Sequence, residues 1–77
     1  MEIQVQLYSI LRDKLPPKSK GKAILHLNSG SSLQDLLNEL GITRQVVISV
    51  NSVHEMDTTR QLQDGDIVKM FSSISGG

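Results

Sequence analysis

The segment SSLQDLLNELG (residues 31–41) decides the fold, because it is the clearest helix in the chain and stands between two groups of short strands. Ser31 or Ser32 can cap its N-terminus, and Gly41 stands where a left-handed residue commonly ends a helix. Four leucines follow the i, i+3, i+4, i+7 spacing that forms one apolar stripe: Leu33, Leu36, Leu37 and Leu40. The stripe is barely longer than one heptad, so it predicts a single core-facing helix and not a coiled coil.

Two strands are expected before this helix. Residues Glu2 to Tyr8 alternate between apolar and polar side chains, and Lys22 to Leu27 do the same less regularly. Between them, Ile10 to Leu15 can form a short helical turn, which Pro16-Pro17 would end. The two strands are therefore expected to form a hairpin, with one apolar face built from Ile3, Val5, Leu7, Ala23, Leu25 and Leu27.

Three further strands are expected after the helix. Val46 to Val50 is an apolar run suited to a buried strand, and Asn51-Ser52 can turn the chain back toward Val53. Asp64-Gly65 is a tight-turn signal, and Asp66 to Phe71 is the last predicted strand.

This order of elements predicts a mixed sheet, because a connection through a helix must cross the sheet before the chain re-enters it. We expect an α+β protein with the β-grasp (ubiquitin-like) plan, in which one main helix packs on one face of a four- to five-stranded sheet. The pairing of the last strand beside the first, in parallel, rests on fold analogy. Residues 1–71 would form the domain and residues 72–77 a flexible C-terminal tail ending in Gly-Gly.

Composition excludes several classes of function. The formal net charge is zero and only Tyr8 and Phe71 are aromatic, which argues against a nucleic-acid partner. Without cysteine there is no thiol nucleophile, and His26 and His54 have no second ligand at metal spacing, so no metal site is expected. No apolar run is long enough to span a membrane and no secretory signal is visible, so we expect a soluble, cytoplasmic protein.

The segment after Phe71 reads as a tail. Small and polar residues lead into Gly76-Gly77, and glycine without a Cβ can enter a channel too narrow for other residues. One interpretation is that the carboxylate of Gly77 is the reacting group, and that Gly76, Ser75 and Ile74 insert into a partner. The alternative is a frayed terminus.

The two aromatic residues form a candidate interaction surface. Tyr8 shares the polar face of its strand with Gln4 and Gln6, and Phe71 alternates in phase with Lys69. If the first and last strands are adjacent, both rings lie on the outer face beside the root of the tail, as an exposed apolar patch. Alternatively, Phe71 points inward and Lys69 lies at an edge.

The chain resembles the MoaD/ThiS family of ubiquitin-like sulfur carriers over nearly its whole length. The closing stretch is the most specific part: a leucine, an Asp-Gly-Asp turn, a strand and Gly-Gly. The first connection, with Leu11-Arg12-Asp13, is more similar to the molybdopterin-synthase small subunit than to the thiamine carrier. The matching stretches are residues 3–8 and 10–13, SLQDLL at 32–37, Val50-Asn51, LQDGDIV at 62–68, and Gly76-Gly77.

The resemblance implies a carrier and not an enzyme, with no permanently bound cofactor. A MoeB/ThiF-like adenylating enzyme of the ubiquitin-activating type would use ATP to form an acyl-adenylate at Gly77. A sulfur donor would then leave a thiocarboxylate there. A MoaE-like synthase subunit would receive the sulfur for molybdopterin (molybdenum cofactor) biosynthesis. Phe71, Tyr8 and, from the family's helix start, Arg12 would bind partners.

Two alternatives stay open at this point. The same carrier chemistry could serve thiamine, another sulfur metabolite or tRNA thiolation, or the chain could be conjugated to proteins as a ubiquitin-like modifier. A different class is a non-catalytic β-grasp interaction module with an inert C-terminus.

Overall fold

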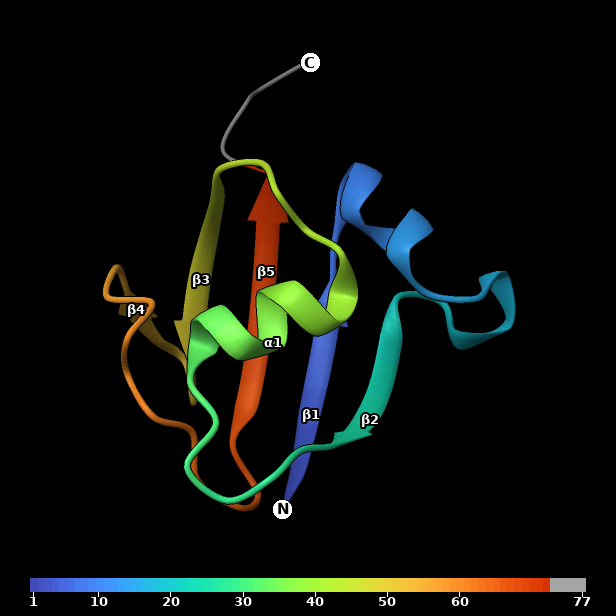
Figure 1. Cartoon of the computed structure of the whole chain (residues 1–77). Coiled ribbons are helices and arrows are strands. Elements are labelled where there is room, and N and C mark those ends of the chain that lie inside the picture. Colours follow the sequence, from blue (N-terminus) through green and yellow to red (C-terminus); the bar gives the residue numbers. More distant parts are fainter. Residues whose placement is uncertain (73–77) are drawn as a thin grey trace.

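A computed structural model of the chain describes residues 1–72 (Figure 1). The residues predicted to insert into a partner or to react lie outside the described residues: Ile74, Ser75, Gly76 and Gly77. In chain order the elements are β1 (Glu2–Leu7), the 3₁₀ helices η1 (Ser9–Lys14) and η2 (Pro17–Ser19), β2 (Lys22–His26), α1 (Leu33–Leu40), β3 (Val46–Val50), β4 (Val53–Glu55) and β5 (Ile67–Ser72).

The five strands form one mixed sheet in the order β2-β1-β5-β3-β4. β1 is antiparallel to β2 and parallel to β5, while β3 is antiparallel to both β5 and β4. Helix α1 lies across one face of the sheet (Figure 1). The predicted fold class, an α+β protein with one helix on a mixed β-grasp sheet, is confirmed, and so is the parallel pairing of the first and last strands.

The core lies between α1 and the inner face of the sheet. The leucines of α1 are all buried, which confirms the predicted stripe. From the central strand β5, Val68 and Met70 are fully buried beneath the helix. The remaining core residues come from β1, η1, β3 and the segments next to the strands: Ile3, Val5, Leu7, Leu11, Ile42, Ile48, Val50 and Leu62.

Both ends of α1 are capped as the sequence predicts. The Ser32 hydroxyl accepts a hydrogen bond from the Asp35 N–H at 3.2 Å, and the Asp35 carboxylate accepts one from the Ser32 N–H at 2.9 Å. This reciprocal capping box satisfies backbone donors that the helix itself leaves unpaired. At the other end, Gly41 adopts a left-handed conformation with φ of 71°.

The loop from Met56 to Leu62 supplies the rest of the N-terminal cap. The backbone N–H groups of Leu33 and Gln34 donate to the carbonyl oxygens of Arg60 and Thr58, at 3.0 and 2.9 Å. The loop therefore holds the start of α1 over the sheet.

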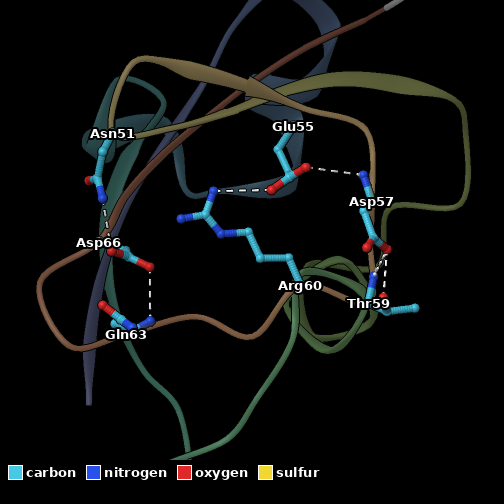
Figure 2. A network of polar contacts seen from close by, with 7 residues as sticks. All are labelled: Asn51, Glu55, Asp57, Thr59, Arg60, Gln63 and Asp66. Atoms are coloured by element: carbon cyan, nitrogen blue, oxygen red, sulfur yellow. Dashed lines mark hydrogen bonds and ion pairs between the residues drawn. The ribbon is translucent and has the colours of Figure 1, made fainter.

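Side-chain hydrogen bonds order this polar loop (Figure 2). Arg60 Nη1 donates to Glu55 Oε1 at 3.1 Å, in a half-buried ion pair. The hydroxyl and the N–H of Thr59 donate to Asp57 Oδ1 at 2.6 and 2.9 Å. These two bonds, the hydroxyl bond first, lower the pKa of the Asp57 carboxyl below its ordinary value.

A second group of polar contacts ties the β3–β4 turn to the start of β5 (Figure 2). The Asp66 carboxylate, only 6% exposed, accepts hydrogen bonds from Asn51 Nδ2 at 2.9 Å and from the Gln63 N–H at 2.8 Å. The Asn51 side-chain oxygen accepts a bond from the Ile67 N–H at 2.9 Å. We call these three contacts the Asn51–Asp66 clamp.

The bounds of some elements differ from the predictions by about one turn or less. β5 continues through Ser72, one residue beyond the predicted strand end at Phe71. Pro17 not only follows the predicted turn but begins a further short helix, η2, since proline fits the first position of a helical turn. Among residues 1–72, no helix is long and apolar enough to cross a membrane.

Candidate functional site

The candidate site lies on the outer face of the sheet, at the end of β5 that leads into the tail. Phe71 is paired with Val47 on the neighbouring strand β3. On the other side, the Tyr8 N–H donates to the Met70 carbonyl oxygen at 3.1 Å, which continues the β1–β5 pairing by one residue. Tyr8, Phe71 and Val47 thus form one lateral row, which we call the tail-root patch.

The two rings of the tail-root patch are stacked. Their centroids lie 4.3 Å apart and the ring planes differ by only 7°. Stacking of two aromatic rings contributes about 0.5–1.5 kcal/mol beyond area burial. Each ring therefore limits the motion of the other and holds a flat apolar surface beside Ser72.

Phe71 faces outward, as predicted. Phe71 and Val47 are each 39% exposed, and Lys69 is half-buried on the same face. The alternative, in which Phe71 points inward and Lys69 lies at an edge, is wrong because β5 is a central strand whose inward positions are occupied by Val68 and Met70.

Val47 is the member of this patch that sequence reasoning missed. Val46 to Val50 was expected to be a buried strand, yet Val47 is exposed on the outer face and Val46 is only partly buried. In residues 1–72 no helix covers that side of β3, so alternate residues reach the surface (Figure 1). A uniform apolar run hides this alternation, and only the pairing with Phe71 reveals it.

Arg12 is not part of the stacked pair of rings. It is exposed on η1, and a Cβ built on Gly21 would lie 3.1 Å from Arg12 Cγ, which places the side chain against the start of β2. No cation–π contact joins Arg12 to either ring within the described part of the chain. η1 still lies at the same end of the sheet as the end of β5 (Figure 1), so a role for Arg12 at the rim of a partner interface stays a prediction.

The other titratable groups form no candidate metal centre in residues 1–72, where no three His, Asp or Glu side chains gather closely enough to share an ion. His26 lies 3.9 Å from the Glu2 carboxylate on the exposed outer face. The reacting and insertion roles of Gly77, Gly76, Ser75 and Ile74 stay predictions, since these residues are outside the described range.

Solved structures share this fold at low sequence identity. SAMP1 from Haloferax volcanii superposes with a TM-score of 0.75 at 13% identity, over 100% of both chains. A putative molybdopterin converting factor subunit 1 from Pyrococcus furiosus gives a TM-score of 0.76 at 19% identity, over 96% of this chain and 99% of that one. A chain from the complex of subunits 1 and 2 of the molybdopterin-converting factor of Helicobacter pylori 26695 gives a TM-score of 0.67 at 15% identity, over 100% of both chains.

Sequence comparison identifies the family. No curated protein sequence matches the chain significantly. The ThiS family, however, matches residues 5–77, which include the second half of β1, the four other strands, the helix α1 and the Gly-Gly ending. The resemblance inferred from the opening strand, the helix start and the Asp-Gly-Asp turn is thereby confirmed: the chain belongs to the ThiS family.

Proposed function

We propose that this protein is a sulfur carrier whose C-terminal carboxylate, on Gly77, is the group that reacts. The family match carries the proposal, because it extends without interruption from the domain through the Gly76-Gly77 ending. The position of Ser72 supports it, since this last described residue follows Phe71 directly, next to the stacked rings of Tyr8 and Phe71. A partner that binds this patch would receive the tail in a fixed direction.

The proposed chemistry needs two steps because a carboxylate is a poor electrophile. An adenylating partner would use ATP, so that the Gly77 carboxylate displaces pyrophosphate and becomes an acyl-adenylate. A sulfur donor would then displace AMP and leave a thiocarboxylate. The chain contributes no catalytic side chain to either step; it presents the reacting atom to its partners.

We propose that a synthase subunit receives the sulfur in molybdopterin formation, within the cytoplasm. The supporting observation is the shared fold with the putative molybdopterin converting factor subunit 1, and with a chain of the complex of subunits 1 and 2. A second candidate, attachment to proteins as a modifier, is favoured by the equally close structural likeness to SAMP1, the small archaeal modifier protein 1 of H. volcanii.

Intact-mass spectrometry tests the carrier proposal. The protein is incubated with ATP, the adenylating enzyme of its own organism and a sulfur donor. We expect an adenylate at Gly77, followed by a mass increase equal to the replacement of one oxygen by sulfur. A variant with one alanine added after Gly77 is the control and should stay unmodified. An unmodified natural chain with every adenylating enzyme of the organism would contradict the proposal.

A second measurement distinguishes sulfur transfer to a synthase subunit from attachment to proteins. Denatured cell extract is digested and searched for lysines that carry a remnant of the C-terminus of this chain. Such remnants would identify a protein modifier. Their absence, together with molybdopterin formation when the thiocarboxylated carrier is added to a synthase subunit, would identify the sulfur donor.

A further inference from the structure

Strand β2 forms an open edge of the sheet. It pairs only with β1 among the described residues, and no strand lies beyond it (Figure 1). The Leu27 N–H donates to the Met1 carbonyl oxygen at 3.0 Å, and the Leu7 N–H donates to the Gly21 carbonyl oxygen at 2.6 Å. These two bonds fix which residues of β2 point their backbone groups toward β1.

The direction of backbone groups alternates along an antiparallel strand. Gly21 and Leu27 face β1, so the odd-numbered residues between them face it too. The N–H and C=O groups of Lys22, Ile24 and His26 therefore point away from the sheet. An unpaired row of this kind is a template for one more strand.

A concentration of positive charge lies beside this edge. Five of the eight cationic residues of the chain fall within residues 12–22, with Asp13 as the one acid among them. All five are exposed, and none forms an ion pair within the described range. Figure 1 shows that the loop with η1 and η2 extends past the start of β2, on the side of the open edge. We call this set the basic arc: Arg12, Lys14, Lys18, Lys20 and Lys22.

A hollow with both polar and apolar side chains lies next to the same edge on the outer face. Gln4 is paired with Ile24 on one side and with Ile67 on the other, so the three side chains form a row. Ile24 is 60% exposed, although it lies in the middle of a strand. A shallow hollow is lined by these three residues with Val5, Gln6, Lys22 and Ala23.

We propose that the open edge of β2 binds an extended acidic segment of a partner protein as a sixth strand. The partner's backbone would pair with Lys22, Ile24 and His26, and an apolar side chain would cover Ile24. In the antiparallel orientation, which is the more stable per residue, the segment's C-terminal end reaches the basic arc. The fitting segment therefore has apolar, strand-forming residues followed by Asp or Glu.

A polyanion such as RNA explains these observations less well. Phosphates would pair with the basic arc, but they would leave the unpaired backbone row and the exposed Ile24 side chain unused. A protein strand uses all three features at once. The proposal does not depend on sulfur transfer, since β2 is separated from β5 by β1.

Amide hydrogen exchange of the full chain tests the proposal. The probe is a synthetic peptide with a Thr-Val-Ile-Val-Thr core followed by glutamates. We expect it to slow exchange at the N–H groups of Lys22, Ile24 and His26. Exchange at Ala23 and Leu25 should change little, because these groups already face β1. The same core followed by lysines should give no protection.

Charge reversal in the basic arc provides the matched variants. Lys18 and Lys20 lie outside the strand. The double variant Lys18→Glu/Lys20→Glu should weaken peptide affinity about tenfold at low salt, because two attractive lysine–glutamate pairs with the peptide become repulsive. Arg44→Glu, at another exposed cation that lies outside the arc, should leave the affinity unchanged. Circular dichroism confirms that each variant is folded.

Three results would overturn the proposal. The first is an acidic peptide that gives no protection at millimolar concentration. The second is a single-stranded RNA oligomer that displaces the peptide and binds the arc without protecting the β2 amides, which would identify a polyanion site. The third is protection that appears with increasing protein concentration alone, which would identify a second copy of this chain as the occupant.

Discussion

Gly21 shows how a single residue can fix the approach of two chain segments. Its φ of 80° is in the left-handed region, and its carbonyl oxygen accepts the hydrogen bond from the Leu7 N–H. A Cβ at this position would lie only 2.5 Å from the Leu7 carbonyl oxygen. The residue before β2 therefore has to be glycine for two separate reasons, backbone conformation and space.

Replacement of Gly21 separates these two reasons. Gly30 has a similar φ of 89° but open space around a built Cβ, so Gly30→Ala measures conformational strain alone. We expect Gly30→Ala to cost about 1–2 kcal/mol of unfolding free energy and Gly21→Ala distinctly more. Denaturant unfolding of both variants measures the difference. Equal losses would show that the backbone near Leu7 relaxes without cost.

The stacked rings of the tail-root patch give a prediction about binding. Phe71→Ala and Tyr8→Ala should each weaken binding to the proposed adenylating partner by about 2 kcal/mol, as expected for aromatic hot spots. The loss of stability should be near the stacking contribution, about 0.5–1.5 kcal/mol. Titration calorimetry and denaturant unfolding measure the two effects. Val53→Ala, at an exposed position on β4, is the control. A loss of about 3–5 kcal/mol in unfolding free energy, as is typical when a core aromatic is truncated, would contradict a docking role for these rings.

Asp57 gives a prediction about pH. Its pKa is lowered in the folded protein, so its contribution to stability is present above the unfolded pKa and disappears as the pH falls through the folded value. Thr59→Ala removes the hydroxyl donor and should raise the pKa of Asp57 toward its ordinary value. Thr59→Ser keeps a hydroxyl and should leave the pKa low. Carboxyl carbon NMR titration measures the pKa of Asp57 in both variants. An unchanged pKa in Thr59→Ala would show that the Thr59 hydroxyl is not the cause of the lowered value.

Among the elements, α1 is the one whose limits the sequence specifies locally. Its leucine stripe, the Ser32 cap and Gly41 all lie within one short segment, so each signal can be interpreted without knowledge of the rest of the chain. The cap made by the Arg60 and Thr58 carbonyl groups could not be predicted this way, because it joins segments far apart in the sequence. The same reason hides Val47, whose exposure follows from its pairing with Phe71.

The Asn51–Asp66 clamp connects two elements, and its loss should be measurable. Asn51→Gly keeps the left-handed turn, where φ is 52°, but removes the side chain that pairs with Asp66 and Ile67. We expect a cost of about 1–3 kcal/mol in unfolding free energy, since a buried carboxylate loses a donor. Ser52→Gly, at the neighbouring left-handed position, should be neutral or slightly stabilising. Equal stability of the two variants would mean that water replaces Asn51 as the partner of Asp66.

At the scale of the whole molecule, the sheet brings together residues that are far apart in sequence. Tyr8 and Phe71 meet because β1 and β5 are parallel neighbours, a pairing that required fold analogy as well as periodicity. The basic arc and the open edge of β2 are juxtaposed by the hairpin, although the charge cluster itself is visible in the sequence. Local patterns thus predict elements and charge, and the pairing of distant strands determines the surfaces.

The central place of β5 has a consequence for how the protein is made in the cell. Of the described strands it is synthesised last, yet it lies between β1 and β3 and contributes Val68 and Met70 to the core. A nascent chain whose β5 residues are still inside the ribosome lacks the middle of its sheet. Folding of the sheet must then wait until β5 has left the ribosome, and long-range parallel pairing of this kind is slow. Chains that terminate before β5 would therefore be left unfolded and exposed to proteolysis, so that only chains with a complete sheet persist.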